Sequence, residues 1–321
     1  MKRRIAMLGA TGTIGRATVR ALVEQGHDVV CIVRPHARTA PQFAGATIRI
    51  ADPADPVSLT RDGFAGEQFD AVVSCMASRT GAPKDARAID HKAHSHALAA
   101  AQKAGTTHFV LLSAICVQKP LLAFQQAKLV FEAELIASGM RYSIVRPTAF
   151  FKSLSGQIER VRKGKGFLLF GDGTLTACKP ISVRDLAAYI AGCLTNEDRW
   201  NQILPIGGPG PAITPRQQGE ALFEMLGQAP KFSSVPVGMI SAIIGVLSAL
   251  GKIVPSLAAK AELAKIGRYY ATESMLVLDP ATGRYSADAT PETGSDTLFD
   301  HYRAIITGEI APDDRGDHAV F

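Results

Sequence analysis

Three glycines near the N-terminus have the spacing of a phosphate-binding loop. The loop follows a short apolar run, residues 4–9, and precedes a helical pattern over residues 13–25. Glycine permits the tight turn and lets a phosphate approach the backbone, while the N–H groups at the start of the helix attract the anion. The segment therefore predicts a dinucleotide site. The residues expected to contact the cofactor here are Gly9, Thr11, Gly12, Thr13, Ile14 and Gly15.

The residues after the second and third expected strands indicate which dinucleotide binds. A carboxylate after the second strand would bind the ribose 2′-hydroxyl of NAD, but this chain has Arg34 there and Arg38 shortly after it. Arginine pairs with a 2′-phosphate, which predicts NADPH. Asp52 follows the third strand, where it is a candidate contact for the adenine amine and equally a candidate turn or helix-cap residue.

A serine and a lysine are placed where they could bind the nicotinamide half of the cofactor. Ser113 ends the fifth expected strand, and Lys128 shares a helix face with Phe124, four residues before it. The spacing resembles the YxxxK motif of short-chain dehydrogenases, in which tyrosine donates a proton and lysine binds the ribose hydroxyls. We expect Lys128 and Ser113 to be catalytic and cofactor-binding residues. Further cofactor contacts are expected after the fourth and sixth strands, at Cys75, Met76, Ala77, Pro147, Thr148 and Ala149.

Phenylalanine in place of the motif's tyrosine favours one kind of reaction. Reduction of a carbonyl creates an oxyanion that must be protonated or stabilised, and Phe124 can do neither. A carbon–carbon double bond conjugated to a large π system lacks that need, because hydride adds at the far carbon and charge spreads into the ring. The substitution therefore predicts double-bond reduction, with Phe124 stacking on a flat substrate.

Strand and helix patterns alternate through the first half of the chain, at the spacing of right-handed crossovers. They predict an α/β fold with a doubly wound parallel sheet of the Rossmann type over residues 1–150. After residue 150 the pattern loosens, with Gly/Pro turns between short elements. We expect a smaller substrate-binding region over 151–321, parts of which rejoin the first domain.

Composition excludes several other classes of protein. The 321 residues are 47% hydrophobic with a net charge of +6, as in a folded globular chain, and the basic residues are too scattered to predict a nucleic-acid partner. The five cysteines form no CxxC pair, and the histidines lack partners at metal-ligand spacing, so we expect reduced thiols and no metal. The start, MKRRIAMLGA, is too short for a targeting peptide, which predicts a cytoplasmic protein.

Residues 232–251 contain no charged side chain. The residues that recur at helical spacing on one face are Val237, Ile240, Ile243, Ile244, Leu247 and Leu250, and Gly238, Ser241, Gly245 and Ser248 are expected on the opposite face. The pattern favours a core or interface helix. The alternatives are a lid over an apolar substrate and peripheral contact of 232–251 with a membrane.

Long strings of this chain resemble the 3,8-divinyl chlorophyllide 8-vinyl reductases, a family of atypical, NmrA-like short-chain dehydrogenases. The resemblance runs from about residue 4 to the C-terminal region and rests on SAICVQKPLLAFQQAKLVFEAEL (113–135), YSIVRPTAFFKSL (142–154) and KIGRYYATESMLVLDP (265–280). It implies NADPH-dependent reduction of the C8 vinyl group of a magnesium tetrapyrrole to ethyl, in chlorophyll or bacteriochlorophyll biosynthesis. Plant members carry a transit peptide, so a phototrophic bacterium is the implied source.

A flat, apolar substrate with a propionate needs apolar walls and a cation. Tyr269 and Tyr270 are candidates to stack on the ring or to donate the proton, with water as the alternative donor. The expected walls are Phe124, Phe150, Phe151 and Phe170, and the expected partners of the propionate are Lys152, Lys179 and Arg268.

Two alternatives stay open from the sequence. One is another atypical double-bond reductase with the same glycine loop and lysine. The other is an NADP-binding redox sensor, or a membrane assembly factor on the same fold, without turnover. Turnover of NADPH with a divinyl substrate distinguishes both from the vinyl reductase.

Overall fold

The computed structural model describes residues 1–35, 43–251 and 254–311 and divides into two compact units. Unit 1 comprises residues 1–78, 83–147 and 183–205. Unit 2 comprises residues 79–82 and 148–182, together with the described chain from Ile206 onward. The chain thus passes into unit 2 after Pro147 and returns to unit 1 for the segment that begins at Val183.

Unit 1 is built on a seven-stranded sheet. Its strands are β1 (Arg4–Leu8), β2 (Asp28–Val33), β3 (Ala46–Ile50), β4 (Ala71–Ser74), β5 (His108–Leu112), β6 (Arg141–Pro147) and β8 (Gln202–Ile206). The order is β3-β2-β1-β4-β5-β6-β8, and the neighbouring pairs from β3 to β6 are parallel. The order reverses at β1, as in a doubly wound Rossmann sheet. This is the fold class that the sequence predicts.

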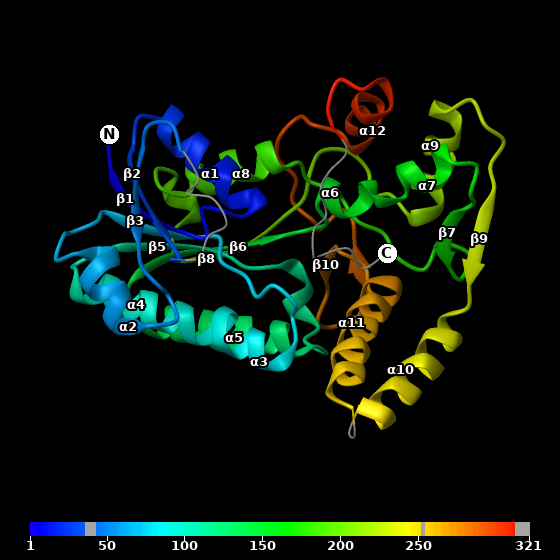
Figure 1. Cartoon of the computed structure of the whole chain (residues 1–321). Coiled ribbons are helices and arrows are strands. Elements are labelled where there is room, and N and C mark those ends of the chain that lie inside the picture. Colours follow the sequence, from blue (N-terminus) through cyan, green and yellow to red (C-terminus); the bar gives the residue numbers. More distant parts are fainter. Residues whose placement is uncertain (36–42, 252–253, 312–321) are drawn as a thin grey trace. The chain divides into compact units, whose positions relative to one another are not determined.

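Helices cover both faces of this sheet. Helices α1 (Thr13–Glu24) and α8 (Val183–Gly192) lie on one face, while α4 (His94–Lys103) and α5 (Ala123–Ala137) lie on the other (Figure 1). Every residue of β4 is buried, as are four of the five in β1. Such continuous apolar strands are expected where parallel strands have helices on both faces. The packed sheet fixes the carboxyl ends of β1, β4 and β5, where the expected cofactor contacts begin.

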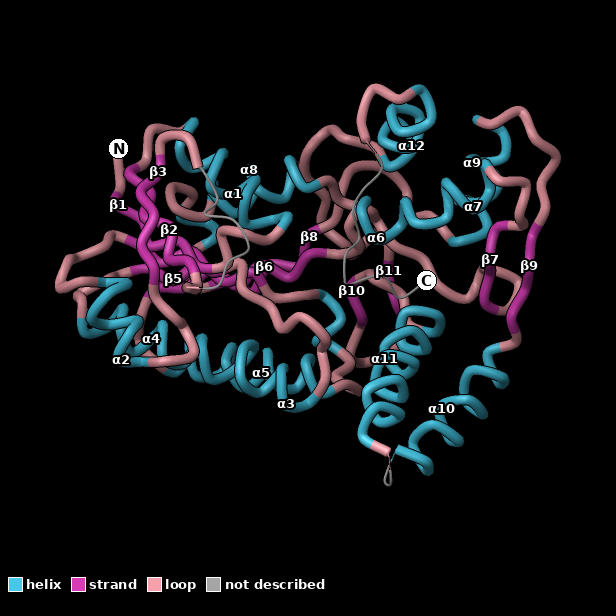
Figure 2. Tube along the Cα trace, viewed as in Figure 1, coloured by secondary structure: helices cyan, strands magenta, loops and turns pink. Residues whose placement is uncertain are grey.

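Unit 2 contains two short sheets and most of the remaining helices (Figure 2). Strands β7 (Phe167–Phe170) and β9 (Phe232–Val235) pair in parallel, and β10 (Val277–Leu278) pairs with β11 (Tyr285–Ser286) in antiparallel. The core of this unit includes Tyr302, whose hydroxyl donates to the Leu154 carbonyl at 2.7 Å. The helices are α6 (Phe151–Leu154), α7 (Ile158–Arg162), α9 (Pro215–Met225), α10 (Val237–Gly251), α11 (Pro255–Thr272) and α12 (Leu298–Thr307).

The helical stretch between Pro83 and Lys103 contains a wide turn. Helix α3 (Pro83–Ala86) leads into a π-helical turn over Arg87–Ala93, and α4 begins at His94. Wide turns of this kind are rare and occur often at functional sites. The other short elements are α2 (Pro56–Ser58), a π-helical turn at Leu59–Phe64, and 3-10 turns at Ile115–Gln118, Ser155–Gln157 and Glu197–Arg199.

The uncharged segment 232–251 differs from the expected core helix. Its first four residues form β9, and none of the residues of α10 is buried. Val237, Ile240, Ile244 and Leu247 lie on the half-buried side, and Gly238 and Gly245 are exposed, as expected. The expected division is wrong for Ser241 and Ser248, which lie on the half-buried side, and for Ile243 and Leu250, which are exposed. Among the described residues, no helix has the length and apolar character needed to cross a membrane.

Candidate functional site

Two of the three loop glycines are required by close packing. Gly9 has a φ of 72°, and a Cβ on it would lie 2.5 Å from the backbone carbonyl carbon of Cys75. A Cβ on Gly15 would lie 2.0 Å from the Gly9 carbonyl oxygen. The turn therefore brings β1, the first turn of α1 and the residues after β4 into direct backbone contact.

Gly12 has a different role, because nothing in the fold crowds it. Its φ is −71°, and a Cβ there would have its nearest neighbour at 3.5 Å. No side chain caps α1 at Gly12, and the first turn of the helix contains no acidic residue. Thr11 and Thr13 beside it are exposed, and Ile14 is buried. This open, uncapped helix N-terminus fits the pyrophosphate of a dinucleotide.

The ends of β2 and β3 carry the residues expected to bind the adenosine half. Arg34 is exposed directly after β2, whose neighbour in the sheet is β1. Arg38 lies outside the described residues. Asp52 is half-buried after β3, and its Oδ1 accepts from the Ala54 N–H at 2.9 Å. Asp52 thus stabilises a turn, and its contact with adenine stays a prediction.

The residues after β4 can offer a cofactor their backbone groups and one unreactive thiol. Burial raises the pKa of Cys75 to about 12, and its sulfur lies 3.8 Å from the Thr18 hydroxyl of α1. A thiol with that pKa is protonated at neutral pH and is a poor nucleophile. Met76 is almost buried and Ala77 is exposed. Any contact of this segment with a cofactor therefore depends on backbone and shape rather than on thiol chemistry.

Lys128 lies in a buried ion pair that the sequence did not predict. Its Nζ is 3.0 Å from Oδ1 of Asp90, in the π-helical turn before α4. The side chain of Lys128 is 10% exposed and that of Asp90 is fully buried. The same Oδ1 accepts the Ser78 N–H at 3.2 Å, so one carboxylate oxygen joins α5 to the loop after β4.

A neutral histidine lies close to this ion pair. His94 Nδ1 is 2.9 Å from the Ile89 carbonyl and therefore carries the proton, which leaves Nε2 to accept from the Ser74 hydroxyl at 2.9 Å. Desolvation and the nearby Lys128 ammonium lower the pKa of His94 to about 4. The imidazole is uncharged at neutral pH and fixed in one tautomer. Asp90 is thus the only counter-ion that the described contacts give Lys128.

Ser113 belongs to a second buried polar group in unit 1. Its hydroxyl donates to Glu132, and Glu132 is held in turn by the Arg146 guanidinium. Ser113 is 6% exposed and Glu132 is 2% exposed. The Ser113 proton is directed to the carboxylate, so the hydroxyl offers a cofactor or substrate only its acceptor lone pairs in this arrangement.

Phe124 lies in the first turn of α5, one turn before Lys128. The turn is fixed because the Gln125 side chain accepts the Leu122 N–H at 2.9 Å. Phe124 is half-buried, and no hydroxyl occupies the place of the tyrosine in the YxxxK motif. The site in unit 1 therefore combines an ammonium with an apolar ring.

The other residues expected to contact the cofactor or the substrate lie in unit 2, except for Pro147 at the end of β6. Thr148 is buried and its hydroxyl donates to the Lys179 carbonyl, while the Ala149 carbonyl accepts the Ile181 N–H at 2.9 Å. Phe150 and Phe170 are half-buried, but Phe151 is 3% exposed and packs in the core of unit 2. The burial of Phe151 leaves little of its ring for contact with a substrate, so the structure does not support it as a substrate wall.

The cations and tyrosines of unit 2 have different surroundings. Lys179 Nζ pairs with Glu292 at 3.1 Å, whereas Lys152 is half-buried and Arg268 is exposed. Tyr269 is buried, and its ring lies edge-on to that of Tyr270, which is 40% exposed. Arg268 is thus the most accessible of the expected partners of the propionate, and Tyr270 is the more accessible of the two tyrosines.

Sequence reasoning missed Asp90, His94 and Glu132 as parts of the site. One signal was available for Glu132, because it follows Lys128 by one helical turn and lies between the apolar residues Phe131 and Leu135 on the buried face of α5. Asp90 and His94 carry no such signal. Their pairing depends on the π-helical turn, which no local pattern announces.

The sheet order and the uncapped glycine turn define a NAD(P)H-binding protein of the Rossmann type, and residues 9–197 match the NAD(P)H-binding family model. A solved structure of the NADPH-dependent quinone oxidoreductase QOR2 from Escherichia coli, complexed with NADPH, has a TM-score of 0.66. It is 20% identical and covers 94% of this chain and 99% of that one, which shows the shared fold.

Close relatives define the family more narrowly. The chloroplastic divinyl chlorophyllide a 8-vinyl-reductases of Cucumis sativus and Oryza sativa subsp. indica are each 50% identical to this chain. The matches cover 99% of the chain, and 79% and 82% of those proteins respectively. The chain belongs to the divinyl chlorophyllide a 8-vinyl-reductase family.

Arg34→Ala should narrow the preference for NADPH over NADH by about tenfold, because a surface arginine–phosphate pair contributes roughly 1.4 kcal/mol. The dissociation constants of both nucleotides, measured by quenching of protein fluorescence, test this. NADPH affinity should fall while NADH affinity stays constant. An unchanged ratio would assign recognition of the 2′-phosphate to another group.

Proposed function

We propose that this chain reduces the 8-vinyl group of a divinyl chlorophyllide to ethyl, with NADPH as the reductant. The observation that carries the proposal is 50% identity to divinyl chlorophyllide a 8-vinyl-reductases over 99% of the chain. The site in unit 1 supports it, since Lys128 is present with its counter-ion and Phe124 replaces the expected phenol. This arrangement suits a double bond better than a carbonyl.

The chain's own groups divide the work of that reaction. NADPH, when bound, supplies a hydride to one carbon of the vinyl group, and a proton must reach the other carbon to give ethyl. The turn at Gly12 would hold the pyrophosphate, and Lys128 would hold the nicotinamide ribose. Ser113 already donates its proton to Glu132. We therefore assign the proton to Tyr270, which is 40% exposed, or to water.

Each unit offers accessible residues as candidate substrate contacts. Phe124 of unit 1 is half-buried, as are Phe150 and Phe170 of unit 2, and each keeps part of its ring accessible for an apolar macrocycle. Arg268 is exposed and suits the propionate better than Lys179, which already pairs with Glu292. Tyr269 is buried, which favours a supporting contact with Tyr270 over direct contact with the pigment.

The direct test is an anaerobic incubation of the purified protein with divinyl chlorophyllide a and NADPH, followed by absorption spectroscopy and chromatography of the pigment. We expect the monovinyl product and consumption of one NADPH per vinyl group. NADPH binding without any product would instead support an NADP-binding sensor or assembly factor.

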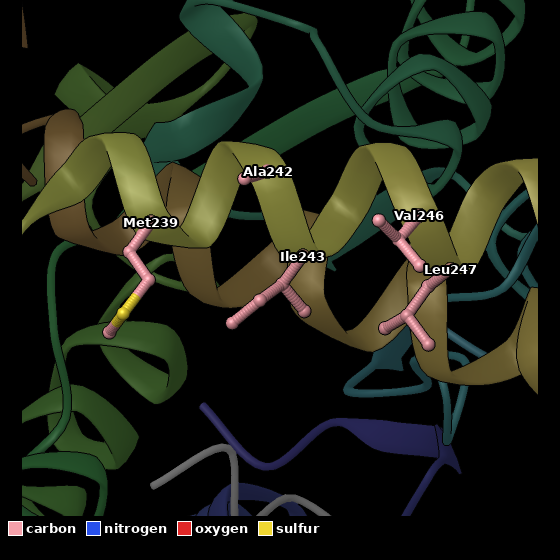
Figure 3. Close-up of a pocket in the computed structure, with 5 residues that line it drawn as sticks. All are labelled: Met239, Ala242, Ile243, Val246 and Leu247. Atoms are coloured by element: carbon pink, nitrogen blue, oxygen red, sulfur yellow. The ribbon is translucent and has the colours of Figure 1, made fainter.

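We also propose that α10 contacts the surface of an anionic membrane. Its exposed side carries Met239, Ile243, Val246 and Leu250, each at least 47% exposed. A hollow of about 300 Å³ on α10 is lined by apolar side chains. Among them, Met239, Ile243 and Leu247 point to the same side of the helix (Figure 3).

Charge complementarity supports a lipid surface as the partner of α10. Between Glu224 and Glu262 the sequence contains lysines and no acidic residue. Basic charge beside an exposed apolar helix is typical of segments that lie in the headgroup region of anionic bilayers. A 15-residue helix is about 22 Å long, shorter than the roughly 30 Å hydrocarbon core, so it would lie along the surface.

A double variant that carries both Ile243→Asp and Val246→Asp should no longer co-sediment with phosphatidylglycerol-containing vesicles, because two charges would have to enter the acyl region. The unaltered chain should sediment with these vesicles and less with pure phosphatidylcholine. Val130→Asp, which changes an exposed apolar residue of α5, is the matched control and should sediment normally. Equal sedimentation of all three proteins would exclude α10 as the contact.

A further inference from the structure

Asp90 is the only fully buried carboxylate that contacts Lys128 among the described residues, and one of its oxygens is unusual. Oδ1 accepts from Lys128 and from the Ser78 N–H, at 3.0 and 3.2 Å. Oδ2 is buried and has no hydrogen-bond partner within the described part of the chain. Such an oxygen is costly to bury, so the carboxylate must be stabilised chiefly by the Lys128 ammonium.

The location of Asp90 explains why a protein would tolerate this cost. Asp90 projects from the π-helical turn Arg87–Ala93 and joins two segments expected at the nicotinamide half of the cofactor. One is α5, through Lys128, and the other is the loop that follows β4, through Ser78. Both contacts use the same oxygen, so a shift of Asp90 would move both segments.

We propose that Asp90 is a positioning residue of the cofactor site: it holds the Lys128 ammonium and the loop after β4 in the arrangement that binds the nicotinamide ribose. The inference rests on the cofactor role proposed for Lys128. Asp90 acts through Lys128 and Ser78, because its free oxygen is inaccessible and cannot itself touch the ribose.

The charged groups around Lys128 make the role of Asp90 separable from simple packing. Asp90 faces Lys128 from the turn before α4, and His94 faces it from α4. His94 is uncharged at neutral pH, since its pKa is lowered to about 4. Glu132, one turn along α5, is held by Arg146. Removing the charge of Asp90 therefore leaves the buried ammonium without a counter-ion.

Asp90→Asn removes this charge but keeps an oxygen that can accept the Ser78 N–H. We expect NADPH affinity to fall about tenfold, because the Lys128 ammonium loses the counter-ion that holds it in place. A merely structural role for Asp90 would lower the urea midpoint and leave the NADPH affinity of the folded chain unchanged. Asp288→Asn, at an exposed position, is the control.

A double-mutant cycle with Lys128→Met completes the test. In the Lys128→Met background, Asp90→Asn should cause no further loss of NADPH affinity. It should also raise the urea midpoint of Lys128→Met, because it removes a buried carboxylate that has lost its partner. Additive losses of affinity, or a lower urea midpoint for the double variant than for Lys128→Met, would overturn the proposal.

These measurements use NADPH binding and unfolding rather than pigment turnover. A chain that binds NADPH and shows the cycle, yet leaves divinyl chlorophyllide a unchanged, would contradict the proposed reaction while retaining the role of Asp90. A chain that reduces the pigment but shows additive effects would retain the reaction and exclude that role.

Discussion

Gly12→Ala should lower NADPH affinity about 100-fold, or roughly 2.7 kcal/mol, while the chain stays folded. A methyl group here meets no atom of the protein closer than 3.5 Å, and the backbone at φ −71° and ψ 166° accepts alanine. The same methyl group occupies the surface that a pyrophosphate must approach to reach the N–H groups of α1. Fluorescence titration with NADPH measures the loss.

Stability measurements distinguish this effect from damage to the fold. Gly12→Ala should lower the free energy of unfolding by no more than about 1 kcal/mol, the cost of a poorer N-cap residue. Gly15→Ala is the contrasting variant, since its Cβ would lie 2.0 Å from the Gly9 carbonyl oxygen, and it should cost about 3 kcal/mol or more. Undiminished affinity in Gly12→Ala would mean that the phosphates bind elsewhere.

Arg146→Met should lower the free energy of unfolding by about 3–5 kcal/mol at neutral pH. The variant leaves Glu132, whose side chain is 3% exposed, as a buried carboxylate with only the Ser113 hydroxyl as donor. Methionine fills much of the volume of the arginine stem, so the loss reports mainly the unpaired charge. Urea unfolding at neutral pH measures this loss.

A surface ion pair helps to identify the cause of that loss. Arg162→Met is the matched control, because Arg162 pairs with Glu159 at the surface and should cost less than about 1 kcal/mol. An equally large loss in Arg162→Met would contradict the buried, unpaired charge of Glu132 as the cause.

The elements of unit 1 followed from local patterns in the sequence. The apolar run at residues 4–9 became β1, and the helical pattern at 13–25 became α1. These signals are strong because buried parallel strands and their covering helices must be apolar at fixed intervals. The glycine spacing likewise indicated the turn before α1, since Gly9 and Gly15 lack room for any side chain.

Segment 232–251 shows where local patterns were insufficient. Its hydrophobicity favoured a core or interface helix with the serines on the far side, yet α10 exposes apolar side chains and turns Ser241 and Ser248 toward the half-buried side. Composition reports how apolar a segment is. Only the packing of α10 on α11 decides which face stays exposed.

The sequence by itself determined the nucleotide-binding fold and the family, and it marked Gly12, Arg34 and Lys128 as candidate site residues. Each of these depends on residue type and on spacing along a single segment. Only the tertiary structure decided the partners of the buried charges. Asp90 reaches Lys128, and Glu132 joins Ser113 to Arg146, through contacts between separate elements. Such pairs depend on distances across the fold, and a buried charge must find its partner there or lose its charge.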